Sequence, residues 1–134
     1  MADLKILGIC GALRAASTNR LLLEEVKRAF GVADYTDADL RLPLFDEDVE
    51  IAEGIPPKVQ LLADQVKAAD GIVICTPEYN KMIPGVLKNA LDWVSRTKGG
   101  PWTDKAVAIL SAADSRGGGD RSQFSLRLAL APFR

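Results

Sequence analysis

Histidine is absent from the 134-residue sequence. Since histidine is the commonest general base and a frequent metal ligand, its absence excludes Ser–His chemistry and most zinc sites, and we predict no metal site. Cysteine is scarce too, because only Cys10 and Cys75 are present, each inside an apolar, strand-like run. Buried packing in a reducing cytosol explains these two residues better than a disulfide does, so we predict a cytoplasmic protein.

Long hydrophobic runs and an excess of one charge sign are also missing. No run approaches the roughly 18 apolar residues that a membrane span needs. Met1-Ala2-Asp3 leads directly into a short apolar run, with no basic region or cleavage signal typical of a secretory leader. The 17 basic and 18 acidic side chains are interleaved and give a net charge of −1, so no nucleic-acid partner is predicted. The length is typical of one domain, residues 1–134.

Apolar segments of strand and helix type alternate along the chain. Helical spacing with a Ser17 or Thr18 cap predicts a first helix, and the start of a second helix tolerates Pro56 and Pro57. The predicted strands are residues 4–9, 32–36, 71–75 and 105–110, and the predicted helices are residues 18–30, 57–69, 84–95 and 121–130. Residues 37–55 are predicted to form a connection rich in aspartate and glutamate.

This alternation predicts right-handed βαβ units around a parallel sheet. In such sheets, ligands bind beyond the carboxyl ends of the strands. Three distinctive loops follow the first, third and fourth predicted strands: the first loop (residues 10–17), the second loop (residues 76–85) and the third loop (residues 111–119). We therefore expect the three loops to meet at one edge of the sheet and to form the binding site.

The first loop combines Arg14 and Ser17 with the start of a helix, followed by Asn19. A helix N-terminus offers unpaired N–H groups and a positive dipole end, and Arg14 can add a bidentate contact, so an anion such as phosphate fits there. A capped helix beside a solvated arginine is an equally good interpretation of the loop alone. The loop has neither the Walker pattern nor GxGxxG, which disfavours a nucleoside triphosphate or a dinucleotide bound in Rossmann fashion.

The second and third loops have the chemistry to line a planar heterocycle. In the second loop two prolines stiffen the chain around Glu78, Tyr79 and Asn80, although a simple turn before a helix explains the same residues. The third loop is rich in glycine, so its backbone can approach a ligand closely. A mobile surface loop is an equally good interpretation of the third loop alone.

The motifs resemble those of the NADPH-dependent FMN reductase family, which includes quinone, chromate and azo reductases. The likeness lies in Gly-x-x-Arg-x-x-Ser-x-Asn-Arg from Gly11, in Thr-Pro-Glu-Tyr-Asn from Thr76, and in Ile-Pro-Gly-Val-Leu-Lys-Asn-Ala-Leu-Asp-Trp from Ile83. Residues 42–48 also resemble the family's connection after its second strand. The resemblance implies a flavodoxin-like α/β fold, a three-layer αβα sandwich with a parallel sheet.

The resemblance also implies a function and a set of site residues. The expected enzyme is an FMN-dependent NAD(P)H oxidoreductase that transfers hydride from NADPH through noncovalent FMN to a quinone, an azo dye, a metal oxyanion or free flavin. The chemistry then belongs to the cofactor, and no catalytic side chain is expected. By motif position, the phosphate is held by Arg14, Ser17 and Asn19, the isoalloxazine is lined by Pro77, Glu78, Tyr79 and Asn80, and the third side is closed by Ser111, Gly117 and Gly118.

Two departures from the family pattern stand out. Ala12 occupies a position where the family usually has serine, and one lost hydroxyl contact to phosphate costs about 1.5–3 kcal/mol, or about ten- to a hundredfold in affinity. The fifth strand and last helix of the fold also have no counterpart in this sequence. One face of the doubly apolar strands 71–75 and 105–110 is then uncovered, so we expect either a homo-oligomer that covers it (a dimer or tetramer, as is common in the family) or a chain that continues past Arg134.

Two other functions compete with the reductase. A flavodoxin-type electron carrier binds FMN without nicotinamide turnover, but such carriers tend to be strongly acidic and to use a Ser/Thr-rich phosphate loop. The near-neutral charge and Arg14 favour the enzyme. A flavin-free remnant, disabled by Ala12 or by the missing elements, is the third possibility.

Overall fold

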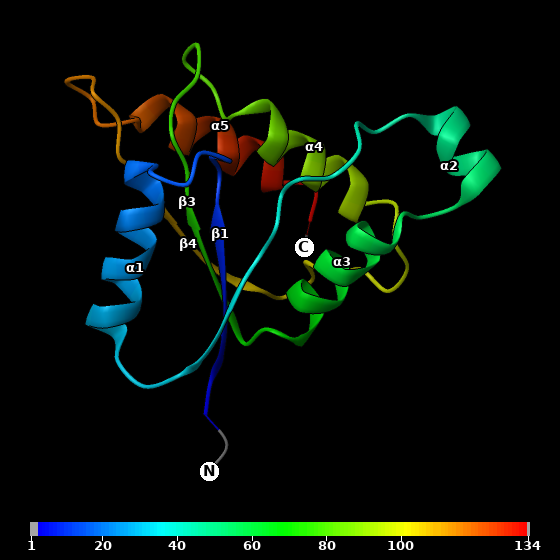
Figure 1. Cartoon of the computed structure of the whole chain (residues 1–134), viewed down its shortest axis with the longest axis horizontal. Helices are drawn as coiled ribbons and strands as arrows, with labels where there is room; N and C mark the ends of the chain where they lie inside the picture. Colours follow the sequence, from blue (N-terminus) through cyan, green and yellow to red (C-terminus); the bar gives the residue numbers. More distant parts are fainter. Residues whose placement is uncertain (1–2, 134) are drawn as a thin grey trace.

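The computed structural model describes residues 3–133 and shows four parallel strands with five helices. The sheet has the order β2-β1-β3-β4, so the chain crosses from β2 over β1 to β3 (Figure 1). This arrangement confirms the predicted flavodoxin-like α/β class. In chain order the elements are β1 (Lys5–Cys10), α1 (Thr18–Phe30), β2 (Asp34–Asp37), α2 (Glu47–Glu53), α3 (Pro57–Ala68), β3 (Gly71–Cys75), α4 (Gly85–Val94), β4 (Ala106–Leu110) and α5 (Asp120–Leu130).

One face of the sheet carries large aliphatic side chains and is covered by α3, α4 and α5. Leu7, Ile9, Ile72 and Ile74 are at most 2% exposed and belong to one core cluster with residues of these three helices, including Leu126 of α5. Burial of branched aliphatic side chains on both sides of a strand is typical of parallel sheets. Most of the hydrophobic core therefore lies on this face.

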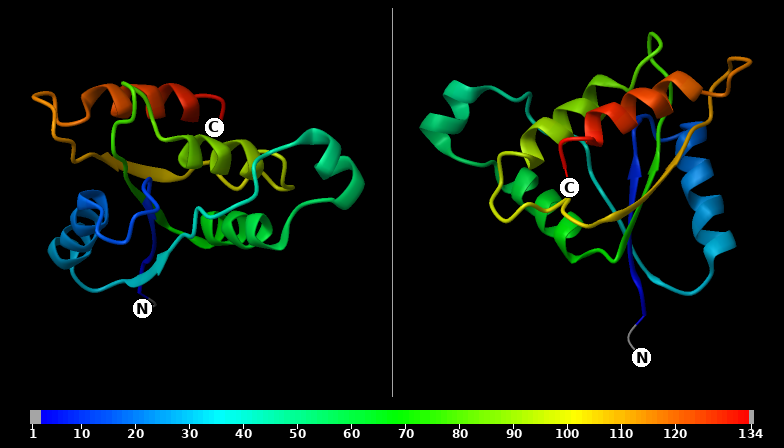
Figure 2. Two further views of the ribbon diagram at one scale, coloured as in Figure 1. Left: turned by 45° about the horizontal axis from the view of Figure 1, so that its top comes forward. Right: turned by 180° about the vertical axis from the view of Figure 1, so that it is seen from behind.

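Of the helices in residues 3–133, α1 is the one that covers the opposite face. Figure 2 shows α1 and α5 on opposite sides of β4. Near the base of this face the strands carry small residues, among them Gly8, Gly71, Ala106 and Ala108, which leave an apolar groove of ≈ 350 Å³ beside α1. Ala106 and Ala108 are exposed within β4. The expectation of a partly uncovered sheet face is confirmed, and the groove lies at the amino-terminal half of the strands, away from the three loops.

The predicted element boundaries agree with the structure to within a few residues, with one error. Residues 37–55 are not a plain connection, since they contain the seven-residue helix α2. Asp46 caps this helix by accepting the Asp48 N–H at 2.9 Å, and Gly54 ends it with φ of 80°. The signal was present in the sequence as an aspartate, a run of acidic residues that favours a helix N-terminus, and a closing glycine.

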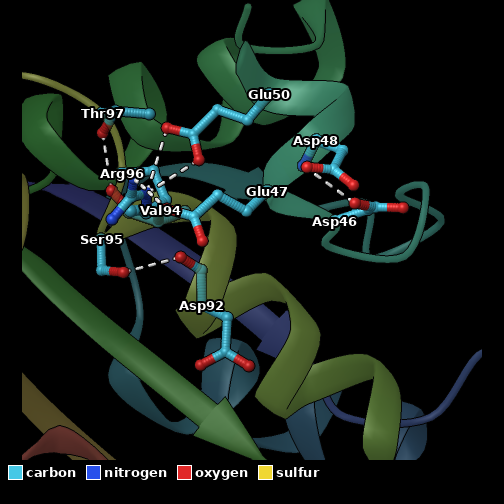
Figure 3. A network of polar contacts seen from close by, with 9 residues as sticks. All are labelled: Asp46, Glu47, Asp48, Glu50, Asp92, Val94, Ser95, Arg96 and Thr97. Atoms are coloured by element: carbon cyan, nitrogen blue, oxygen red, sulfur yellow. Dashed lines mark hydrogen bonds and ion pairs between the residues drawn. The ribbon is translucent and has the colours of Figure 1, made fainter. Parts of the chain in front are cut away.

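The connection after β2 is attached to one face of α4. Asn89 accepts the Phe45 N–H at 2.8 Å and donates to the Pro43 carbonyl at 3.0 Å, and Trp93 also donates to that carbonyl. Just beyond α4, Arg96 donates from Nε to both carboxylate oxygens of Glu50 at 2.9–3.0 Å (Figure 3). Asn89, Trp93 and Arg96 are spaced i, i+4 and i+7, so they lie along one side of the helix and its extension.

Candidate functional site

The three loops extend from the carboxyl ends of β1, β3 and β4, which is the edge that the sequence predicted (Figure 1). The first two loops are in direct contact. The Gly11 N–H donates to the Cys75 carbonyl at 2.8 Å, and a Cβ at Gly11 would lie only 2.9 Å from Thr76 Oγ1. Glycine is required here because the two backbones approach so closely. Gly11 and Thr76 thus bring the first and second loops together, and neither was among the predicted site residues.

The N-terminus of α1 opens directly onto this edge. Ser17 is the N-cap, and its hydroxyl accepts the Asn19 N–H at 3.2 Å. Within residues 3–133, the N–H groups of residues 12–16 and of Thr18 donate to no protein atom. Arg14 is exposed and forms no ion pair within the described range. Unpaired N–H groups, a positive dipole end and an unpaired guanidinium suit an anionic ligand.

The motif implied that Asn19 contacts the phosphate, but in the structure both polar atoms of its side chain are hydrogen-bonded to the protein backbone. Its side chain is 1% exposed, and both of its polar atoms contact Ala112 at the start of the third loop. Nδ2 donates to the Ala112 carbonyl at 2.9 Å and Oδ1 accepts the Ala112 N–H at 2.9 Å. The residue joins the first and third loops, and a single sequence gives no signal for that pairing.

The second loop contains a tight turn at its tip. Tyr79 and Met82 exchange two backbone hydrogen bonds of 3.0 and 3.1 Å, and the residues between them, Asn80 and Lys81, both have positive φ. This is the pattern of a type I′ turn, in which asparagine is favoured at such angles. Pro77 is buried at the base of the loop, while Tyr79 is 52% exposed. Tyr79 therefore offers a ring that a planar ligand can contact.

Glu78 connects the second loop to α5. The N-cap of α5 is Gly119, which has no side chain to accept the first N–H groups of the helix. Glu78 Oε2 accepts the N–H groups of Arg121 and Ser122 at 3.1 and 3.3 Å instead. A carboxylate at this position also faces the positive end of the helix dipole.

The third loop folds back on itself through Ser111. The Ser111 hydroxyl donates to the Gly118 carbonyl at 2.6 Å and accepts from Gln123 Nε2 at 2.7 Å. Gly118 and Gly119 have φ of 61° and 90°, values that glycine adopts readily. Gly117 and Gly118 thus lie in a loop closed by the Ser111 hydroxyl.

Cys75, at the end of β3, provides no reactive thiol to the site. Burial raises the pKa of its thiol to about 12, with a smaller contribution from Cys10. Both cysteines are free and buried in the structure. The thiol stays protonated near neutral pH, so the arrangement contains a polar, anion-accepting cradle and an exposed aromatic ring but no activated nucleophile.

This donor set suits a flavin mononucleotide. The unpaired N–H groups around Arg14 and Ser17 suit a phosphate, and the second and third loops extend from the same edge of the sheet. Together, the fold and the loops define a flavodoxin-like domain with a mononucleotide site at the carboxyl edge of its sheet.

Comparisons with known proteins identify the family. Residues 4–134 match the NADPH-dependent FMN reductase family. An NAD(P)H-dependent FMN reductase of Pseudomonas aeruginosa is 44% identical over 133 residues, covering 96% of this chain and 70% of the relative. A quinone reductase of Escherichia coli is 39% identical over 130 residues, covering 95% of this chain and 69% of the relative. A flavoenzyme NAD(P)H:(acceptor) oxidoreductase structure from Paracoccus denitrificans superposes with a TM-score of 0.86 at 29% identity, covering 96% of this chain and 71% of that one.

The chain belongs to the NADPH-dependent FMN reductase family. Membership confirms the predicted class, an FMN-dependent NAD(P)H oxidoreductase. Among the helices of residues 3–133, none combines the length and the apolar composition required to cross a bilayer.

Proposed function

We propose that this protein oxidises NAD(P)H and reduces a small acceptor at the carboxyl edge of its sheet. Bound FMN supplies the hydride-transfer chemistry. The acceptor classes that we propose are those expected from the motifs: quinones, azo dyes, metal oxyanions and free flavin. The observation that carries the proposal is the set of unpaired N–H groups of residues 12–16 and of Thr18 beside Arg14, on the same edge as the exposed Tyr79.

The site residues divide into those that we propose contact FMN and those whose polar side-chain atoms contact other parts of the protein. Arg14 and Ser17 hold the phosphate, together with the unpaired N–H groups of the first loop. Pro77, Tyr79 and Asn80 line the ring from the second loop, and the backbone at Gly117 and Gly118 closes the third side. Asn19, Glu78 and Ser111 contribute to the same site, but their polar side-chain atoms contact other parts of the protein.

An enzyme is favoured over a flavodoxin-type carrier. The net charge of −1 is far from the strongly acidic surface expected of a carrier, and the phosphate loop contains an arginine. The relatives named as an NAD(P)H-dependent FMN reductase and as a quinone reductase also support the enzyme.

Anaerobic reduction of the flavin-loaded protein tests this proposal. The protein is expected to take up FMN and turn yellow, and NADPH is expected to bleach the flavin absorbance under anaerobic conditions. Bleaching only by dithionite would indicate a carrier. Protein that takes up no added FMN would indicate a flavin-free remnant and would contradict the proposal.

We also propose a homo-oligomer, a dimer or tetramer, in which a second copy covers the apolar groove beside α1. Exposed apolar surface of this kind is typical of an interaction site. Sedimentation should give the mass of a dimer or tetramer of the 14.4 kDa chain, and a monodisperse monomer would contradict the oligomer. A cytoplasmic location is proposed on the basis of the two free, buried cysteines.

A further inference from the structure

We propose that Asn19 and Glu78 are positioning residues that fix the two ends of the third loop, so that the flavin site is assembled before the cofactor binds. The link to FMN rests on the proposed function. The contacts themselves are properties of the protein chain and can be tested without any ligand.

The first end of the loop is fixed by Asn19. Its amide pairs with both backbone groups of Ala112, the second residue of the third loop, at 2.9 Å each. A primary amide can donate and accept simultaneously, which neither a carboxylate nor a hydrocarbon side chain can reproduce. At 1% exposure these hydrogen bonds are shielded from competing water, so losing them leaves buried polar groups unpaired.

The second end of the loop is fixed by Glu78. The residue after the loop is Asp120, the first of α5, and the next two N–H groups go to Glu78 Oε2. Arg121 has a second acceptor in Asp120 Oδ1 at 2.8 Å. The charged Glu78 carboxylate is the side-chain acceptor available to Ser122, and it comes from the second loop, 44 positions away.

Between these two ends the loop has little else to order it. Residues 114–117 are exposed, and Gly117, Gly118 and Gly119 make the backbone flexible. Its internal contacts are the hydrogen bond from the Ser111 hydroxyl to the Gly118 carbonyl and a turn in which the Gly118 N–H donates to the Ser115 carbonyl at 2.9 Å. A loop that is disordered in the free protein must be ordered by its ligand, and this ordering reduces affinity. Fixing both ends beforehand removes that cost.

Hydrogen exchange on the flavin-free protein is the first test. Asn19→Ala and Glu78→Ala should each speed amide exchange at Gly118, whose N–H donates to the Ser115 carbonyl at 2.9 Å, by about tenfold or more, because the loop opens more often. Asn89→Ala is the matched control, since Asn89 also bridges a backbone N–H and a backbone carbonyl but attaches the connection after β2 to α4. It should leave exchange at Gly118 at the wild-type rate.

The FMN affinity of the same variants is the second test. Each alanine variant should bind FMN about tenfold more weakly. The affinity of the double variant should fall by less than the product of the two single factors, because a loop released at one end is already mobile. Glu78→Gln should recover part of the loss, since an amide oxygen accepts the same hydrogen bonds without the charge. Asn19→Asp should recover little, because a carboxylate accepts from the Ala112 N–H but cannot donate to its carbonyl.

The outcomes separate this inference from the proposed function. Amide exchange at Gly118 at the wild-type rate in both alanine variants would overturn the inference. So would a double variant whose loss of FMN affinity equals the product of the two single losses, as for two independent ligand contacts. If Asn19→Ala does not fold, Asn19→Asp provides the same comparison, and if Glu78→Ala does not fold, Glu78→Gln should show a smaller effect in the same direction. If the wild-type protein binds no FMN, the proposed function fails, while the exchange data still decide whether the two residues fix the loop.

Discussion

The indole Nε1 of Trp93 donates a 2.7 Å hydrogen bond to the carbonyl of Pro43, across 50 positions of sequence. Trp93 is fully buried, and its ring meets the edge of Phe45 at a centroid distance of 5.0 Å. The segment around Trp93 and the segment at residues 42–48 are two parts of the family resemblance. The structure shows that they contact each other, so packing between the two segments accounts for this part of the likeness.

Replacing Trp93 with phenylalanine should lower the free energy of unfolding by about 1–3 kcal/mol, since it removes a buried hydrogen bond and leaves a small cavity. Urea denaturation measures this change. Trp102→Phe is the matched control, because Trp102 is 6% exposed and its Nε1 has no partner in the part of the chain that the structure describes. The Trp102 variant should lose less stability, and equal losses would contradict the role assigned to the Trp93 hydrogen bond.

Gly119→Ala should destabilise the protein more than Gly118→Ala. Both glycines have positive φ, 90° and 61°, and such backbone angles cost an alanine about 1–2 kcal/mol. A Cβ at Gly119 would also lie 2.8 Å from Ser111 Cβ, whereas nothing lies within 4 Å of a Cβ at Gly118. The difference should be about 1–3 kcal/mol by urea denaturation. Similar losses would mean that Ser111 moves aside freely.

The thiol of Cys75 predicts a dependence of stability on alkaline pH. Its pKa in the folded protein is about 12, above the ordinary value of 9.0, because burial disfavours the thiolate. The folded state therefore holds the proton more tightly, and this stabilisation is complete below pH 9 and decreases as the pH rises toward 12.

A comparison of the wild type with Cys75→Ala isolates this dependence from other groups that titrate in the same range. The stability advantage of the wild type over the variant should shrink between pH 9 and 10.5, by up to about 1.4 kcal/mol per pH unit. Denaturant titrations at each pH measure it. An advantage that stays constant over this interval would show that the thiol has no raised pKa.

Ala108→Asp should dissociate the proposed oligomer. Ala108 is exposed in the apolar groove, so a carboxylate there stays hydrated in a single chain but is buried, unpaired, when a second copy covers the groove. Sedimentation should show a shift toward 14.4 kDa with unchanged circular dichroism. Leu44→Asp, at a residue 83% exposed on the connection after β2, should leave the assembly intact. An unchanged oligomer in the Ala108 variant would place the interface elsewhere.

The sequence predicted the parallel sheet and the common edge of the loops, because both follow from the alternation of strands and helices. It did not predict α2, which is short and acidic and is stabilised in part by Arg96, 46 positions from Glu50. It also assigned Asn19 and Glu78 to the ligand. Their partners, Ala112 and the start of α5, are distant in the sequence and use backbone groups, which carry no sequence pattern.

Binding of FMN compared with riboflavin tests the site most directly, since the two ligands differ by the phosphate. Wild-type protein should quench FMN fluorescence at concentrations at least about tenfold below those needed for riboflavin, because a charge-assisted phosphate contact is worth about 1.5–3 kcal/mol. Arg14→Ala should weaken FMN binding and leave riboflavin binding unchanged. Equal affinity of the wild type for both ligands, or an Arg14 variant that still prefers FMN as strongly, would contradict a phosphate site at the N-terminus of α1.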